Sequence, residues 1–132
     1  MDLPFLEWEI RNFLKVKMPA EDKDLAPMVR YYALAANARR KEGAAPLEAI
    51  RFYEKALQEA PDFEWLHHHM ALSYFDMKNY DQAETYASRA AELNPNFYLP
   101  ILTMGDIALE EKNYPRAIHH FKRAEGVVAQ FK

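Results

Sequence analysis

The sequence lacks cysteine altogether and contains only three glycines among its 132 residues. Without cysteine, the chain can form no disulfide, no thiolate nucleophile and no Cys-based zinc site, and this absence agrees with a reducing compartment. The scarcity of glycine beside many Ala, Leu, Glu, Lys and Arg residues favours helix, because these residues lose little conformational freedom on entering one. We therefore expect an all-α protein.

An excess of positive charge and long apolar runs are also missing. The chain has 17 Lys and Arg residues against 20 Asp and Glu residues, so nothing in its charge suggests a nucleic-acid partner. No run approaches the roughly 20 apolar residues of a membrane span. Glu7, Glu9 and Arg11 interrupt the N-terminal segment where a secretory signal would need an unbroken apolar core. We expect a cytoplasmic protein without a membrane span.

Two stretches of the sequence repeat each other. They are "KNYDQAETYASRAAELNPNF" (78–97) and "KNYPRAIHHFKRAEGVVAQF" (112–131). The shift that carries Lys78 onto Lys112 aligns further positions: Ala49 with Ala83 and Ala117, Ala56 with Ala90 and Ala124, and Pro61 with Pro95. The paired alanines are two helical turns apart, which places them on one face of a helix where a neighbouring helix can approach closely. The sequence therefore predicts three helix pairs.

Prolines mark where these helices begin and end. Pro61 and Pro95 lack the amide proton that a helix interior needs, so each separates one helix from the next. Pro46 and Pro115 lie near the start of a helix, where the missing proton costs nothing. The predicted helices are 28–41, 47–59, 62–77, 81–93, 97–111 and 115–130.

This pattern closely resembles the tetratricopeptide repeat (TPR), a helix–turn–helix unit whose period equals the shift found here. The segments "MALSYFDMKNYDQA" (70–83) and "MGDIALEEKNYPRA" (104–117) carry its signature, with Ala71 and Gly105 at the small position of the first helix. The first copy departs by one extra residue near Gly43, and Ala87 replaces the aromatic residue of the middle copy's second helix. The resemblance implies a right-handed superhelical solenoid with repeats at 29–63, 64–97 and 98–131.

Residues 1–28 precede the repeats and predict an N-terminal amphipathic helix with a linker. Leu6, Ile10, Phe13 and Leu14 form an apolar stripe at helical spacing. Three roles stay open for this helix: it caps the solenoid, occupies the groove of its own chain, or pairs with another subunit.

The resemblance also implies a function, because TPR proteins hold a peptide or helix in the concave groove lined by their first helices. We expect a non-catalytic interaction module with a protein or peptide partner. The family's groove positions correspond here to the following residues: Arg30, Leu34, Asn37, Lys41, Trp65, His68, His69, Leu72, Phe75, Leu99, Leu102, Thr103 and Asp106. Of the clamp that some members use for a C-terminal carboxylate, only Asn37 is preserved, so we do not expect that mode of binding.

An alternative is a structural assembly subunit or secretion-type chaperone that forms a homo-oligomer through the N-terminal helix or the C-terminal edge. Catalysis and metal binding are not expected. The consecutive histidines 67–69 point about 100° apart on a helix and cannot converge on one ion. The sequence contains no nucleophile elbow, phosphate loop or zinc-protease motif, and we expect no cofactor.

Overall fold

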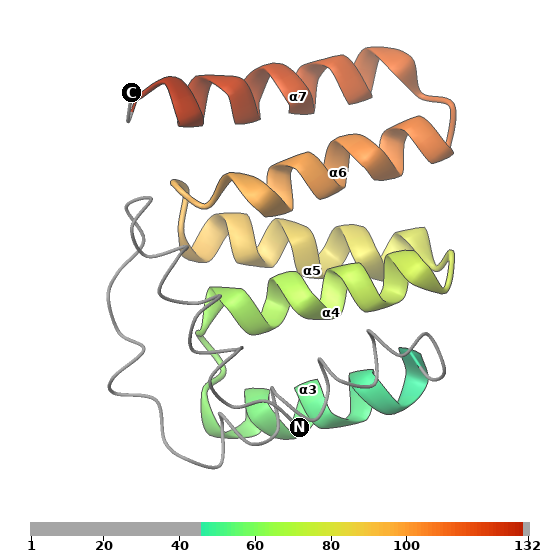
Figure 1. Cartoon of the computed structure of the whole chain (residues 1–132), viewed down its shortest axis with the longest axis vertical. Helices are drawn as coiled ribbons and strands as arrows, with labels where there is room; N and C mark the ends of the chain where they lie inside the picture. Colours follow the sequence, from blue (N-terminus) through green and yellow to red (C-terminus); the bar gives the residue numbers. More distant parts are fainter. Residues whose placement is uncertain (1–45, 131–132) are drawn as a thin grey trace.

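The computed structural model describes residues 46–130, which form five helices and, within this range, no strand (Figure 1). The helices are α3 (Pro46–Glu59), α4 (Glu64–Asp76), α5 (Tyr80–Leu93), α6 (Tyr98–Glu110) and α7 (Tyr114–Ala129). The predicted helices differ from these bounds by at most two residues, and the all-α class is confirmed for this part of the chain. The expected N-terminal helix, the helix at 28–41 and the groove residues Arg30, Leu34, Asn37 and Lys41 lie outside the described residues.

The repeated Lys-Asn-Tyr sequence forms the turn inside each helix pair. Lys78 and Lys112 adopt left-handed backbone geometry, with φ of 62° and 60°. The amides of Lys78 and Asn79 donate to the carbonyls of Phe75 and Tyr74, the two-bond pattern that closes a helix C-terminus. The Asn79 side chain then accepts a bond from the amide of Gln82 and caps the next helix. The motif thus ends one helix and starts the next.

The second copy of this turn repeats every one of these bonds. The amides of Lys112 and Asn113 donate to the carbonyls of Leu109 and Ala108, and the Asn113 side chain accepts from the amide of Arg116. The matching geometry of the two turns explains why the same three letters recur one repeat length apart.

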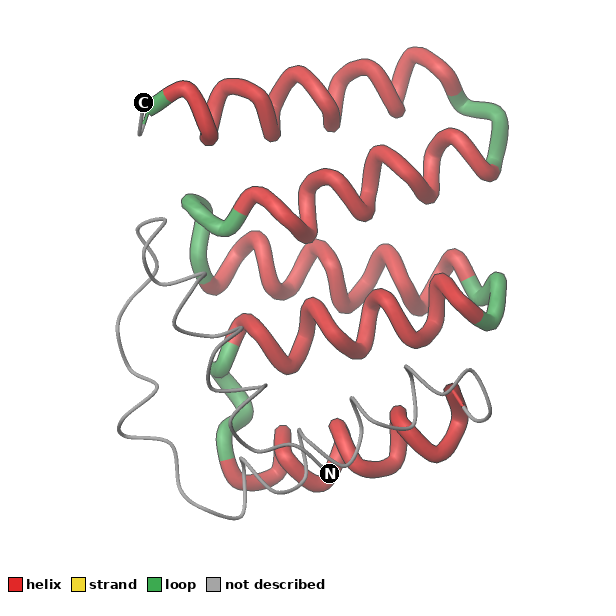
Figure 2. The backbone as a smooth tube through the Cα atoms, viewed as in Figure 1, coloured by secondary structure: helices red, strands yellow, loops and turns green. Residues whose placement is uncertain are grey.

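The helices lie in a row, each packed on its neighbour in sequence (Figures 1 and 2). In addition, α4 contacts α6, whereas no contact of comparable extent joins α5 to α7. The stack is therefore tighter on the side of α4 and α6 and more open on the side of α5 and α7. This difference gives the solenoid a concave side, formed by α4 and α6.

Alanines at the helix interfaces allow close packing, as their spacing predicts. Ala83, Ala87 and Ala90 on α5 are fully buried. Gly105 on α6 also allows close packing. Even alanine would not fit there without a shift, since a β-carbon added at Gly105 would lie 2.5 Å from the Phe121 ring. Side chains of different sizes therefore interlock between paired helices.

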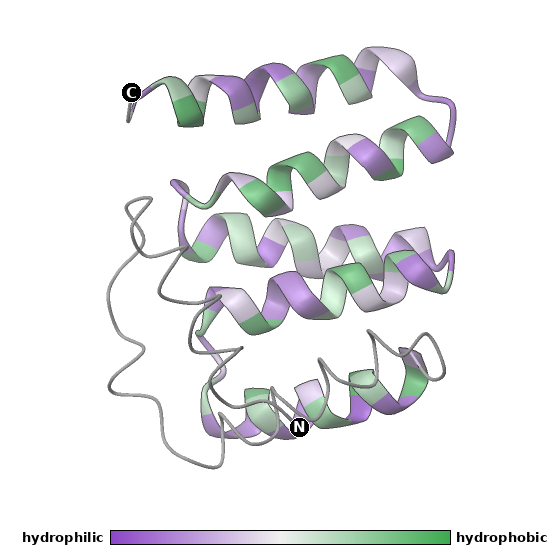
Figure 3. Cartoon of the chain, viewed as in Figure 1, coloured by the Kyte–Doolittle hydropathy of each residue, from purple (hydrophilic) through white to green (hydrophobic). Residues whose placement is uncertain are grey.

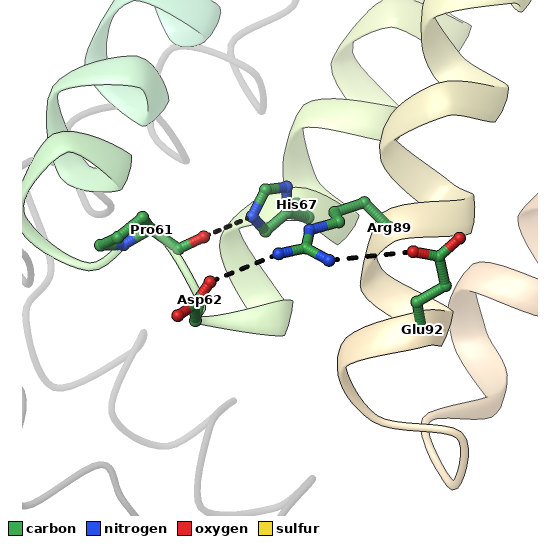
Figure 4. A network of polar contacts seen from close by, with 5 residues as sticks. All are labelled: Pro61, Asp62, His67, Arg89 and Glu92. Atoms are coloured by element: carbon green, nitrogen blue, oxygen red, sulfur yellow. Dashed lines mark hydrogen bonds and ion pairs between the residues drawn. The ribbon is translucent and has the colours of Figure 1, made fainter.

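A small polar network fixes the turn between α3 and α4 (Figure 4). The Nε2–H of His67 donates to the Pro61 carbonyl oxygen over 2.7 Å. Arg89 on α5 lies 3.4 Å from an Asp62 carboxylate oxygen and 3.8 Å from one of Glu92. Exposed ion pairs of this kind contribute little, so the part-buried His67 bond is the stronger of these side-chain links to the turn.

Candidate functional site

One face of α6 combines exposure with apolar character. The residues of this helix that stay partly or fully exposed beyond its first position are Leu99, Leu102, Asp106, Leu109 and Glu110. They recur at steps of three, four, three and one residues, so they form one stripe along the helix. The remaining residues between Pro100 and Ala108 are buried against α5 and α7. Figure 3 shows that apolar residues recur along α6. Some of these apolar residues, including Leu102 and Leu109, are partly or fully exposed.

The neighbouring helix α4 extends this surface. Leu72, Phe75 and Asp76 are partly or fully exposed and share one face of the helix. Tyr74 is directed away from them, because its ring stacks on Tyr86 of α5 at 5.6 Å between centroids. Since α4 contacts α6 directly, and the Phe75 ring contacts Tyr80, which lies beside Glu110 of α6, the two exposed faces adjoin. We call their residues the concave stripe: Leu72, Phe75, Asp76, Leu99, Leu102, Asp106, Leu109 and Glu110.

Three of the predicted groove residues are buried. Trp65, His68 and His69 retain 4%, 4% and 5% of their surface. The Trp65 ring stacks on His69, with centroids 4.6 Å apart and planes at 14°, and meets Phe97 edge-on at 5.5 Å. His69 stacks in turn on Tyr53 of α3 at 5.4 Å. These side chains form an aromatic layer between α3 and α4, and their role as ligand contacts stays a prediction.

The other predicted residues fall into two groups. Thr103 is buried, and its hydroxyl donates to the Leu99 carbonyl of its own helix over 3.2 Å. Leu72, Phe75, Leu99, Leu102 and Asp106 belong to the concave stripe.

Leu109, which is 43% exposed, was not among the predicted site residues. It lies one repeat length after Phe75, so the repeat itself carries the signal that would have found it.

Carboxylates give one end of the concave stripe its charge. Burial raises the pKa of Asp106, and the nearby Glu110 carboxylate raises it further. The pKa of Tyr80 is also raised, first by desolvation, then by the charge of Glu110 and by the hydrogen bond that its hydroxyl donates to that carboxylate. Acidic groups that already repel each other favour a cation beside them.

A separate cleft of about 390 Å³ lies on the open side of the stack, between α5 and α7. Arg116 of α7 forms an ion pair with Glu84 of α5 across it. His120 lines this cleft and is buried, and neither of its ring nitrogens has a hydrogen-bond partner within residues 46–130. Burial lowers the pKa of His120, and the positive charges of Arg116, His119 and Arg123 lower it further.

Two kinds of feature are absent from the described residues. Between residues 46 and 130, no group of three His, Cys, Asp or Glu side chains is placed to hold a metal ion. In the same range, no helix has the length and apolar character needed to cross a bilayer.

Comparison with known proteins finds the same repeat that the sequence pattern predicts. Residues 42–100 match the family model of the tetratricopeptide repeat. This match confirms the resemblance to the tetratricopeptide repeat that the sequence pattern predicts. One curated relative, the Protein SGT1 homolog of Bos taurus, is 31% identical over 80 residues. The match covers 61% of this chain but only 24% of that protein, so the chain spans about a quarter of the relative's length.

Solved structures share the fold at low sequence identity. The Sgt2 TPR domain from Aspergillus fumigatus is 18% identical with a TM-score of 0.74, and the alignment covers 80% of this chain and 70% of that one. The second TPR of Spaghetti (RPAP3), bound to the HSP90 peptide SRMEEVD, is 17% identical with a TM-score of 0.69 and coverages of 80% and 94%. A mutant of MamA is 17% identical with a TM-score of 0.68 and coverages of 96% and 98%.

Proposed function

We propose that this chain is a non-catalytic interaction module that binds a peptide or an amphipathic helix of another protein along its concave stripe. The single observation that carries this proposal is the row of apolar side chains left on the surface of α4 and α6, namely Leu72, Phe75, Leu99, Leu102 and Leu109. Scattered apolar residues on a surface are normal, but a continuous apolar row beside polar groups is typical of a docking site.

The packing beside the stripe supports this role. The aromatic layer of Trp65, His69 and Tyr53 is buried and stacked, and Leu99 of the stripe packs against the core cluster that contains Trp65 and Tyr53. A preformed surface loses little conformational entropy on binding. Among the similar structures, the second TPR of Spaghetti is described as bound to a peptide, which supports a peptide as the ligand of this fold.

The test is a comparison of two double variants. Phe75→Ala with Leu109→Ala removes two apolar contacts from the stripe. Leu47→Ala with Ile118→Ala removes two exposed apolar side chains from α3 and α7 and serves as the control. We expect affinity capture from an extract of the source cells to lose specific partners with the first pair and to retain them with the second.

Circular dichroism would confirm that both double variants keep their helix content. The proposal fails if the folded Phe75→Ala/Leu109→Ala protein captures every partner that the parent captures.

A second candidate is the predicted assembly subunit, which two exposed residues of α7 favour. Tyr114 and Ile118 are 56% and 55% exposed and lie one helical turn apart. Under this alternative, light scattering shows a mass that rises with concentration, and Ile118→Asp restores the monomer. A monomer mass that stays constant across the concentrations counts against the assembly.

A further inference from the structure

Charge is unevenly distributed among the helices. The sequences of α4, "EWLHHHMALSYFD", and α6, "YLPILTMGDIALE", contain no lysine or arginine. In α3, α5 and α7, by contrast, basic and acidic residues are mixed: Arg51, Lys55, Arg89, Arg116, Lys122 and Arg123 all lie there. Within residues 46–130, the two helices of the concave side, α4 and α6, therefore carry Asp and Glu but no Lys or Arg.

The carboxylates are placed within the apolar row. Asp106 lies between Leu102 and Leu109 on the exposed face of α6, and Glu110 follows Asp106 one turn later. Neither carboxylate forms an ion pair with a lysine or arginine in the part of the chain that the structure describes. Their mutual repulsion is one cause of the raised pKa of Asp106. A positive group from a ligand would relieve this repulsion.

The spacing sets the size of the matching ligand. The stripe runs along α6 from Leu99 to Glu110, a rise of about 16 Å. A ligand helix of about three turns covers that length and can place apolar residues and cations on the same side. An acidic ligand such as SRMEEVD, the peptide bound to the Spaghetti domain, would instead meet carboxylates of its own charge.

On the basis of the proposed function, we infer that the partner segment is basic as well as apolar: its leucine-like residues contact Phe75, Leu102 and Leu109, and its lysine or arginine side chains pair with Asp106 and Glu110. This assignment rests on complementarity of both shape and charge. It names the chemistry of the ligand that the concave stripe selects.

The experiment is selection of binders from a phage library of random peptides, each long enough to form about four helical turns, on the full chain. Peptides are kept for analysis when they bind the parent but lose binding to the Phe75→Ala/Leu109→Ala variant. We expect these peptides to contain more Lys and Arg than Asp and Glu, together with apolar residues at helical spacing.

Affinity measurements on the selected peptides then test the two carboxylates. Asp106→Asn with Glu110→Gln is expected to weaken binding about three- to tenfold at low salt and to reduce the dependence of affinity on salt, since exposed charges at an interface act in this way. Glu59→Gln with Glu125→Gln removes two exposed carboxylates from α3 and α7 and should leave affinity unchanged.

The outcomes separate this inference from the proposed function. Binders that depend on Phe75 and Leu109 but are acidic or uncharged overturn the inference and leave the groove function in place. Equal affinity of the parent and the Asp106→Asn/Glu110→Gln protein likewise overturns the inference and leaves the groove function in place. A library that yields no binder dependent on the stripe overturns both.

Discussion

Replacing Gly105 with alanine should destabilise the protein, although alanine is the better helix former. The new β-carbon would lie 2.5 to 2.8 Å from three carbons of the Phe121 ring, so the ring or the helix must move. Overpacking of this kind costs about 1–3 kcal/mol. The gain in helix propensity from Gly to Ala offsets up to about 1 kcal/mol. We expect a net loss of up to about 2 kcal/mol in the free energy of unfolding.

Gly126 provides a matched control. It also lies inside a helix, but a β-carbon added there meets no atom within 4 Å. Gly126→Ala should therefore stabilise the protein by about 0.5–1 kcal/mol, the propensity gain alone. The two Gly→Ala substitutions are thus predicted to have opposite signs.

Thermal and urea unfolding, followed by far-ultraviolet circular dichroism, measures both effects. The same Gly105→Ala substitution made in Phe121→Ala protein tests the cause. In Phe121→Ala protein, which has lost stability of its own, the ring no longer opposes the new methyl group. Gly105→Ala should then become stabilising, and the double-mutant cycle should show a coupling of about 1 kcal/mol or more, within the range for residues in contact. If Gly105→Ala stabilises the parent as much as Gly126→Ala does, the packing argument is refuted.

Three further predictions concern the turns and the cleft. Asn113→Ala removes the side chain that caps α7 and should cost about 1 kcal/mol in urea unfolding; no loss would exclude the cap. Lys112→Gly places glycine where φ is 60° and should raise the melting temperature; a lower one would contradict strain at this position. His120 has a lowered pKa, so the folded state resists its protonation, and stability contributed by its neutral form is lost as the pH falls through the ordinary value of 6.5. His120→Gln should therefore lose less stability than the parent as the pH falls from slightly alkaline to mildly acidic, whereas identical pH profiles would show that His120 does not titrate as described.

The helices could be predicted because local signals agree with the packing. Pro61 and Pro95 interrupt helices wherever they occur, and the alanines at Ala83 and Ala90 reveal a close interface through their spacing alone. The left-handed geometry of Lys112 gave no such signal. Lysine rarely occupies that region, so the position is set by the bonds that the following asparagine makes.

The candidate site was harder to predict than the helices. Family positions alone cannot tell whether a first-helix residue reaches the surface, because that depends on neighbours distant in sequence. Trp65 and His69 are buried by contacts that include Tyr53, on a different helix. Leu109, by contrast, is exposed at the position equivalent to Phe75, and comparison between the copies would have placed it in the site.

Leucine methyl NMR of the full chain tests the binding surface most directly. A peptide selected as described above is titrated into the protein, and the methyl signals of Leu72, Leu102 and Leu109 on the concave stripe are compared with that of Leu47 on α3. The account predicts saturable shifts of the three stripe leucines and an unmoved Leu47 signal. Shifts confined to the leucines of α3 or α5, with the stripe signals unchanged, would contradict it.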